Sequence, residues 1–124
     1  MPLHNAEIAD RLNRLAALLE IEGANRFRVR AYRNAAGTVA GLPRDAAAML
    51  ADGEDLSELP GIGEDLAGKI AEMVETGSLQ ALDEVEARVP PGLFEMTRVP
   101  GLGARKVKAL YDALGLDSLD ALRE

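Results

Sequence analysis

The sequence contains no cysteine and a single histidine, His4. A disulfide, a thiolate zinc site and a cysteine nucleophile are therefore excluded, and one imidazole cannot form a metal-binding cluster. No apolar run approaches the roughly 20 residues that a membrane helix needs, and residues 1–10 are mildly acidic, unlike a signal peptide. We therefore expect a cytoplasmic protein without a membrane partner.

Charge is unevenly distributed along the 124 residues, whose formal net charge of -7 by itself opposes a nucleic-acid partner. Two windows contain no acid. They hold Arg26, Arg28, Arg30, Arg33 and Arg44 within residues 23–44, and Arg98, Arg105, Lys106 and Lys108 within residues 97–111. Two basic patches in an acidic surface attract an anion locally, although ordinary solvated helix faces would explain them equally well.

Hydrophobic spacing is helical throughout, and no segment has a convincing strand pattern. Asn5 is a candidate N-cap for a first helix that ends at Gly23, and Asp45 for a short helix over residues 46–51. The inward positions are Ile8, Leu12, Leu15 and Leu19 in the first helix, and Phe27, Ala31, Ala35 and Val39 in a second helix over residues 26–40. On that second helix Arg26, Arg30 and Arg33 share another face. The sequence therefore predicts an all-α fold.

An internal repeat divides the chain into two units, because residues 59–63 (LPGIG) match residues 99–103 (VPGLG). Each unit combines a short helix, this turn and a longer amphipathic helix. The buried stripes are expected at Leu66, Ile70, Met73 and Val74, and at Val107, Leu110, Tyr111 and Leu114. Since the units are separated by Pro90, Pro91 and Gly92, we expect a small helical domain over residues 1–89, with a first hairpin at 55–76, and a second unit over 92–124.

The repeated turn resembles the helix-hairpin-helix motif. Glycine can adopt positive φ and lets another backbone approach closely, which applies to Gly61 and Gly63 and equally to Gly101 and Gly103. Exposed amides at a helix N-terminus suit a phosphate oxygen and read no base sequence. The turn therefore predicts sequence-independent binding to a nucleic-acid backbone.

The two hairpins differ in charge directly after the turn. Arg105, Lys106 and Lys108 follow the second turn, whereas Glu64 and Asp65 follow the first. Acids suit a helix N-terminus but repel phosphate. We therefore expect the second hairpin and the arginine-rich helix to contribute most of the affinity.

Several segments together resemble the N-terminal part of family X DNA polymerases, especially the bacterial branch: residues 28–36, 58–63, 75–79 and 98–103, and Lys69. The resemblance covers nearly the whole chain. It implies a small domain that holds the 5′ side of a DNA gap, followed by the start of the fingers region. Gapped or nicked DNA in base excision repair is the implied partner, together with the polymerase body. The family's polymerase and nuclease metal sites have no counterpart here, so neither activity is expected of this chain.

The resemblance also implies individual roles. Tyr32 matches a tyrosine of the family's DNA-facing helix and is the preferred stacking aromatic, whereas Phe27 is expected in the core. The predicted DNA-binding residues are Arg26, Arg28, Arg30, Tyr32, Arg33, Gly61, Gly63, Lys69, Gly101, Gly103, Arg105, Lys106 and Lys108. No cofactor is required, but a monovalent cation (Na⁺ or K⁺) is implied at each hairpin. Its ligands would be the backbone carbonyls of Ser57, Leu59 and Ile62, and of Thr97, Val99 and Leu102.

Two alternatives stay open. Some family members use a lysine matching Lys69 as a Schiff-base nucleophile that removes a 5′-deoxyribose phosphate. Asp65 and Glu72 on the same helix face favour the charged amine, and an ordinary Asp65–Lys69 surface pair also explains the residue. Asp65 and Phe27 further depart from the lysine and histidine common in lyase-active members. The other alternative is a protein-interaction module with purely structural hairpins.

Overall fold

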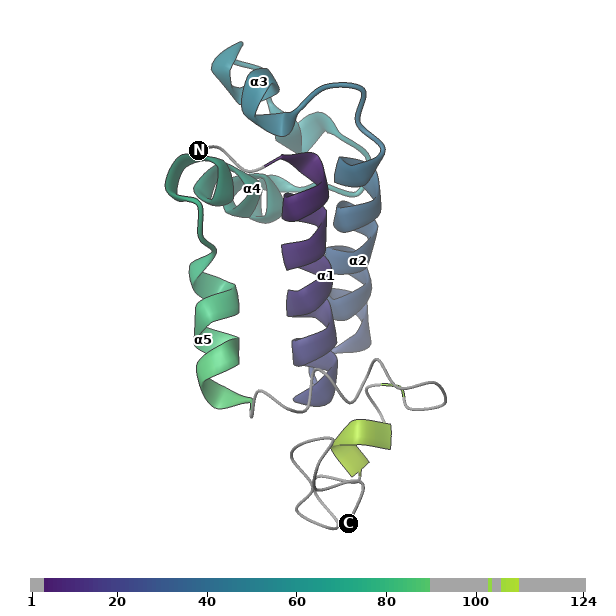
Figure 1. The fold of residues 1–124 in the computed structure, drawn as a ribbon. Helices are drawn as coiled ribbons and strands as arrows, with labels where there is room; N and C mark the ends of the chain where they lie inside the picture. Colours follow the sequence, from purple (N-terminus) through teal and green to yellow (C-terminus); the bar gives the residue numbers. More distant parts are fainter. Residues whose placement is uncertain (1–3, 90–102, 104–105, 110–124) are drawn as a thin grey trace.

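The computed structural model describes residues 4–89, 103 and 106–109 (Figure 1). Its elements are α1 (Asn5–Ile21), α2 (Arg26–Ala40), α3 (Ala46–Ala51), the 3-10 turn η1 (Leu56–Glu58), α4 (Glu64–Thr76) and α5 (Gln80–Arg88). Residues 106–109 are also helical. Because these ranges contain no strand, the all-α prediction is confirmed. None of the described helices is long and apolar enough to cross a membrane.

The helices α1 and α2 lie side by side and run antiparallel, and the other elements are arranged around this pair (Figure 1). The turn between them begins at Gly23, whose φ of +81° is the left-handed conformation that glycine adopts most easily. The next amide, of Ala24, donates to the Leu19 carbonyl at 2.9 Å. Buried alanines on both helices, such as Ala16 and Ala35, allow the two backbones to approach closely.

The core lies between this pair and the helices α4 and α5, with α4 crossing near the start of α1 (Figure 1). The largest fully buried side chains are Ile8, Leu12, Leu15, Val39, Leu56, Ile70, Met73, Leu79 and Val107. Burying each such side chain contributes about 1.5–3 kcal/mol. The predicted stripe of the first helix is therefore confirmed, as are Leu66, Ile70 and Met73 in α4, whereas Val74 is partly buried.

The contact between α1 and α3 corrects the expected helix caps. His4 is the N-cap of α1, and the Asn5 side chain instead reaches the start of α3. There its Oδ1 accepts from the Ala46 amide and its Nδ2 donates to the Arg44 carbonyl, both at 2.7 Å. Asp45 is the N-cap residue of α3, but its side chain makes no capping hydrogen bond. The capping group of α3 therefore comes from another helix.

Candidate nucleic-acid interface

The first hairpin turn, residues 59–63, has the geometry that its glycines and isoleucine predict. Gly61 has a φ of +77°, and Ile62 is only 3% exposed because its side chain inserts into the core. The Ile62 amide donates to the Leu59 carbonyl at 3.0 Å, which closes the turn. Gly63 is the N-cap of α4 and carries no side chain to cover the helix start.

The start of α4 exposes backbone donors. Within the described residues, the amides of Gly63, Glu64 and Asp65 have no hydrogen-bond acceptor. Free amides at the positive end of a helix dipole favour an anion, and phosphate is the usual one. The acidic side chains of Glu64 and Asp65 are both exposed beside them, so the attraction comes from the backbone alone.

The arginines of α2 are all exposed, and no acid occurs on this helix. Arg33 pairs with Glu20 of α1 at 3.2 Å, and the guanidinium of Arg28 lies 5.9 Å from the centre of the Tyr32 ring. Arg30 has no carboxylate within salt-bridge distance among the residues described. Arg26, Arg30 and Arg33 line a common hollow of about 350 Å³, which confirms that they share one face. Since like charges one turn apart destabilise a helix, this clustering favours an anionic ligand.

The two aromatic residues of α2 exchange the positions expected from the sequence. Tyr32 is 3% exposed and belongs to the core, so its prediction as the stacking aromatic is wrong. Phe27 is 67% exposed, so its prediction as a core residue is wrong. Its ring is flanked by basic side chains and lies 5.6 Å from the guanidinium carbon of Arg26. Phe27 is therefore the aromatic surface that a base could reach.

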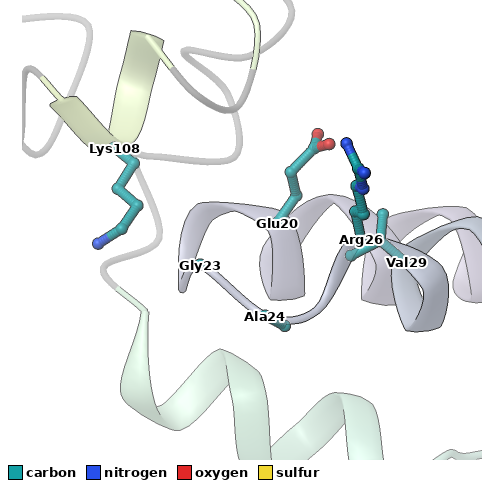
Figure 2. Close-up of a pocket in the computed structure, with 6 residues that line it drawn as sticks. All are labelled: Glu20, Gly23, Ala24, Arg26, Val29 and Lys108. Atoms are coloured by element: carbon teal, nitrogen blue, oxygen red, sulfur yellow. The ribbon is translucent and has the colours of Figure 1, made fainter.

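Lys108, in the short helix at residues 106–109, lies against the turn between α1 and α2. Its side chain extends from residues 106–109 toward Gly23 (Figure 2). A Cβ added to Gly23 would lie 3.2 Å from the Lys108 Cε. Both residues line a hollow of about 250 Å³ together with Glu20, Ala24, Arg26 and Val29. The role of Gly23 in this contact had no signal in the sequence beyond that of a helix stop.

Lys69 lies on α4 with a side chain that is 18% exposed, and its Nζ donates to both carboxylate oxygens of Asp65 at 3.0 Å. The surface pair expected from the spacing is therefore present. Glu72, the other acid expected near Lys69, accepts from the Gln80 amide at the start of α5 instead. The Lys69 ammonium has three donor hydrogens, so one remains for a phosphate while Asp65 is bound, whereas attack on a sugar carbonyl requires a neutral amine released from Asp65.

The carbonyl ligands expected for a cation can be assessed at the first hairpin. The carbonyls of Ser57 and Ile62 accept no hydrogen bond from the described residues, and Leu59 accepts the one that closes the turn. A carbonyl oxygen has two lone pairs, so hydrogen bonding leaves an acceptor site on each of the three. The cation at this hairpin stays a prediction. Among the residues described, no group of acidic or histidine side chains could hold a metal ion.

Much of the second hairpin lies outside the described residues. Of its predicted site residues, Gly103, Lys106 and Lys108 are described, and Val107 is buried as its position in the repeat predicts. The predictions that fall outside concern Thr97, Val99, Gly101, Leu102, Arg105, Leu110, Tyr111 and Leu114. Their roles stay predictions.

A glycine motif repeated in the sequence, an all-helical core in the part of the chain that is described and a first turn that exposes amides define a helix-hairpin-helix protein. The chain belongs to the helix-hairpin-helix domain family, whose model matches residues 3–79. Its similarity to family X DNA polymerases is also confirmed. It is 34% identical over 122 residues to the DNA polymerase/3'-5' exonuclease PolX of Bacillus subtilis, covering 98% of the chain and 21% of that protein. It is 25% identical over 120 residues to DNA polymerase lambda of Rattus norvegicus, covering 97% of the chain and 20% of the relative. The chain spans about a fifth of the length of these curated relatives.

Proposed function

We propose that this chain is a sequence-independent DNA-binding module that recognises gapped or nicked duplex DNA during repair. The observation that carries the proposal is the joint position of two anion-attracting features, the open amides at residues 63–65 and the arginine face of α2, on which Arg33 is paired with Glu20 and Arg30 has no carboxylate partner among the residues described. The two features meet at the Arg33 end of the arginine face, because Arg33 and Gly61 line one hollow and Thr38 of α2 donates to the Pro60 carbonyl in the turn at 2.8 Å. Binding through phosphates is compatible with a net charge of -7, since the attraction is local.

A preference for gaps over intact duplex follows from Phe27. A base can stack on an exposed aromatic ring only where it is unpaired, and such stacking is tolerant of sequence. The 67% exposed ring of Phe27 next to Arg26 and Arg28 provides that surface. The names of the polymerase relatives support DNA as the ligand of this chain.

Fluorescence anisotropy over a range of salt tests the proposal. The substrates are a labelled duplex with a one-nucleotide gap, with and without a 5′-phosphate, a nicked duplex and a continuous duplex. We expect the tightest binding to the phosphorylated gap, and an affinity that falls steeply as salt is added. Salt-independent binding, or none at low salt, would favour a protein-interaction module instead.

A matched pair of arginine variants distinguishes the effect of charge on the α2 face from the effect of net charge on DNA affinity. Arg30 has no carboxylate partner among the residues described, whereas Arg44 is bonded to Asp52 and Glu54. We expect Arg30→Gln to weaken binding several-fold and to reduce the slope of log affinity against log salt by about 0.9. Arg44→Gln removes the same formal charge and should change both quantities less. Equal effects would contradict a specific role for the α2 face.

We assign Lys69 to phosphate contact rather than to lyase chemistry, because Schiff-base formation requires a free amine and both Asp65 oxygens bind this one. Borohydride trapping on DNA with a 5′-deoxyribose phosphate tests this assignment. A covalent adduct that disappears in Lys69→Ala would overturn it and establish the lyase.

We also propose that the carbonyls of Ser57, Leu59 and Ile62 hold a monovalent cation when DNA binds. Anisotropy in NaCl, KCl and tetramethylammonium chloride at equal ionic strength distinguishes a bound ion from screening. Equal affinity in all three salts would show that no specific cation is bound at these carbonyls.

A further inference from the structure

A hollow between α2 and the first hairpin turn contains two polar residues, Asn34 and Thr38, that the DNA-binding prediction does not use. Its volume is about 540 Å³, and its lining residues are Arg33, Asn34, Gly37, Thr38, Pro60 and Gly61. One wall is therefore a turn of α2 and the other is the start of the hairpin turn. The two walls come from segments more than 20 residues apart in the sequence.

The two walls are joined by one side-chain hydrogen bond. Thr38 Oγ1 donates to the Pro60 carbonyl at 2.8 Å. A Cβ added to Gly61, the next residue, would lie 3.9 Å from both Thr38 Oγ1 and the Asn34 Cβ. This bond therefore fixes how far the turn stands from α2.

Two glycines keep the hollow open. Gly61 has a φ of +77°, so the turn itself requires it. Gly37 lies within α2, where glycine destabilises a helix by about 1 kcal/mol relative to alanine. A Cβ at Gly37 would meet no atom within 4 Å, so packing does not require glycine there. The absence of a side chain at this position leaves room for a ligand.

Asn34 contributes unused donors to this hollow. Its side chain is exposed, and within the described residues its amide makes no hydrogen bond. The Gly61 amide likewise has no acceptor there. Two nitrogen donors from two walls, beside the guanidinium of Arg33, match the several acceptor oxygens of a phosphodiester.

We propose that this hollow binds a DNA phosphodiester group, that Asn34 contacts it directly, and that Thr38 positions the hairpin turn against Asn34. The inference rests on the proposed DNA-binding function and adds a phosphate contact from α2 that neither the hairpin motif nor the arginines supply. It applies to the backbone of any sequence, since a phosphodiester group carries no base information.

Charge variants at Asn34 test the contact, with Asn13 as the matched control, because Asn13 is an exposed asparagine on α1. In anisotropy titrations of the gapped duplex, we expect Asn34→Lys to tighten binding about five- to tenfold at low salt and to steepen the salt slope by about 0.9. Asn34→Asp should weaken binding at least fivefold. Asn13→Lys and Asn13→Asp should each change affinity less than twofold. A gain of affinity cannot result from misfolding.

Thr38 is tested by removing only its hydroxyl. We expect Thr38→Val to weaken binding about threefold and to abolish the gain from Asn34→Lys in the double variant, whereas Thr38→Ser restores both. Circular dichroism confirms that each variant is folded. Absence of binding by the unsubstituted chain would overturn the proposed function itself. Normal binding with equal effects at positions 34 and 13 would overturn only the Asn34 contact, and a Thr38→Val chain that retains the gain would overturn the role of Thr38.

Discussion

The two aromatic residues of α2 give the sharpest test of the interface, because Phe27 is 67% exposed and Tyr32 is 3% exposed on the same helix. Truncating each to alanine removes a ring of similar size five positions apart. We expect Phe27→Ala to impair DNA binding and leave the fold intact. Tyr32→Ala should instead destabilise the fold, because its ring is buried in the core.

The magnitudes follow from what each ring contacts. A base stacked on an exposed aromatic contributes about 1–3 kcal/mol, so Phe27→Ala should weaken binding to the gapped duplex by roughly 5- to 150-fold. Its stability loss is limited to the contact with Arg26, 5.6 Å from the ring centre, and to about 0.5–1 kcal/mol. Truncating a fully buried aromatic costs about 3–5 kcal/mol, which applies to Tyr32.

Urea unfolding followed by circular dichroism measures the free energy of unfolding, and anisotropy on the gapped duplex measures affinity. Phe27→Leu is the control for losing the aromatic face while keeping apolar bulk, and it should bind as weakly as Phe27→Ala. Two results would refute the reasoning. One is unchanged affinity in Phe27→Ala, and the other is a loss of stability in Phe27→Ala that equals the loss in Tyr32→Ala.

Two further predictions concern contacts between helices. Asn5→Ala removes two hydrogen bonds of 2.7 Å to the start of α3. It should lower the free energy of unfolding, measured by urea titration, by about 1–3 kcal/mol. Asn5→Asp keeps the acceptor for the Ala46 amide and should therefore lower the free energy of unfolding less in the same titration. Arg88, whose Nε lies 2.9 Å from Glu22, holds the pKa of that carboxyl below its ordinary value. A lowered pKa stabilises the fold above the unfolded value of about 4.3 and ceases to do so as pH falls through the folded value. Arg88→Gln should therefore reduce thermal stability at pH 7, and the difference from the unsubstituted chain should shrink below about pH 4; a difference that stays constant with pH would contradict this.

The face that α2 turns toward the core could not be predicted from the sequence. Residues 26–31 alternate basic and apolar side chains, so the expected stripe through Phe27, Ala31, Ala35 and Val39 and a stripe through Val29, Tyr32 and Val39 both have helical spacing. The two stripes lie on neighbouring faces of one helix. Packing against α1 buries Ala35 and Val39 as expected, but it buries Val29 and Tyr32 and leaves Phe27 exposed. A local pattern cannot make that choice, because α1 is a separate element.

The same limit applies to polar side chains. A local capping rule predicts that Asn5 caps its own helix, but a side-chain amide bonds whatever backbone group lies within reach. That group belongs to Ala46. The sequence assigned no role to Thr38 or Asn34, which we place at the phosphate site. Their proximity to Gly61 is a property of the tertiary structure alone.

By itself the sequence determined the helices, the glycine stops after α1 and α2, the buried stripe of α1 and the hairpin turn, because each depends on residues within a few positions of one another. Ile62 entered the core and Gly61 took a positive φ as that local pattern requires. The tertiary structure alone decided which aromatic faces solvent and which side chains line the hollow beside Gly61. Those properties depend on how α2 packs against α1 and the hairpin. That packing is set by the contacts of all the buried side chains together, not by any local segment.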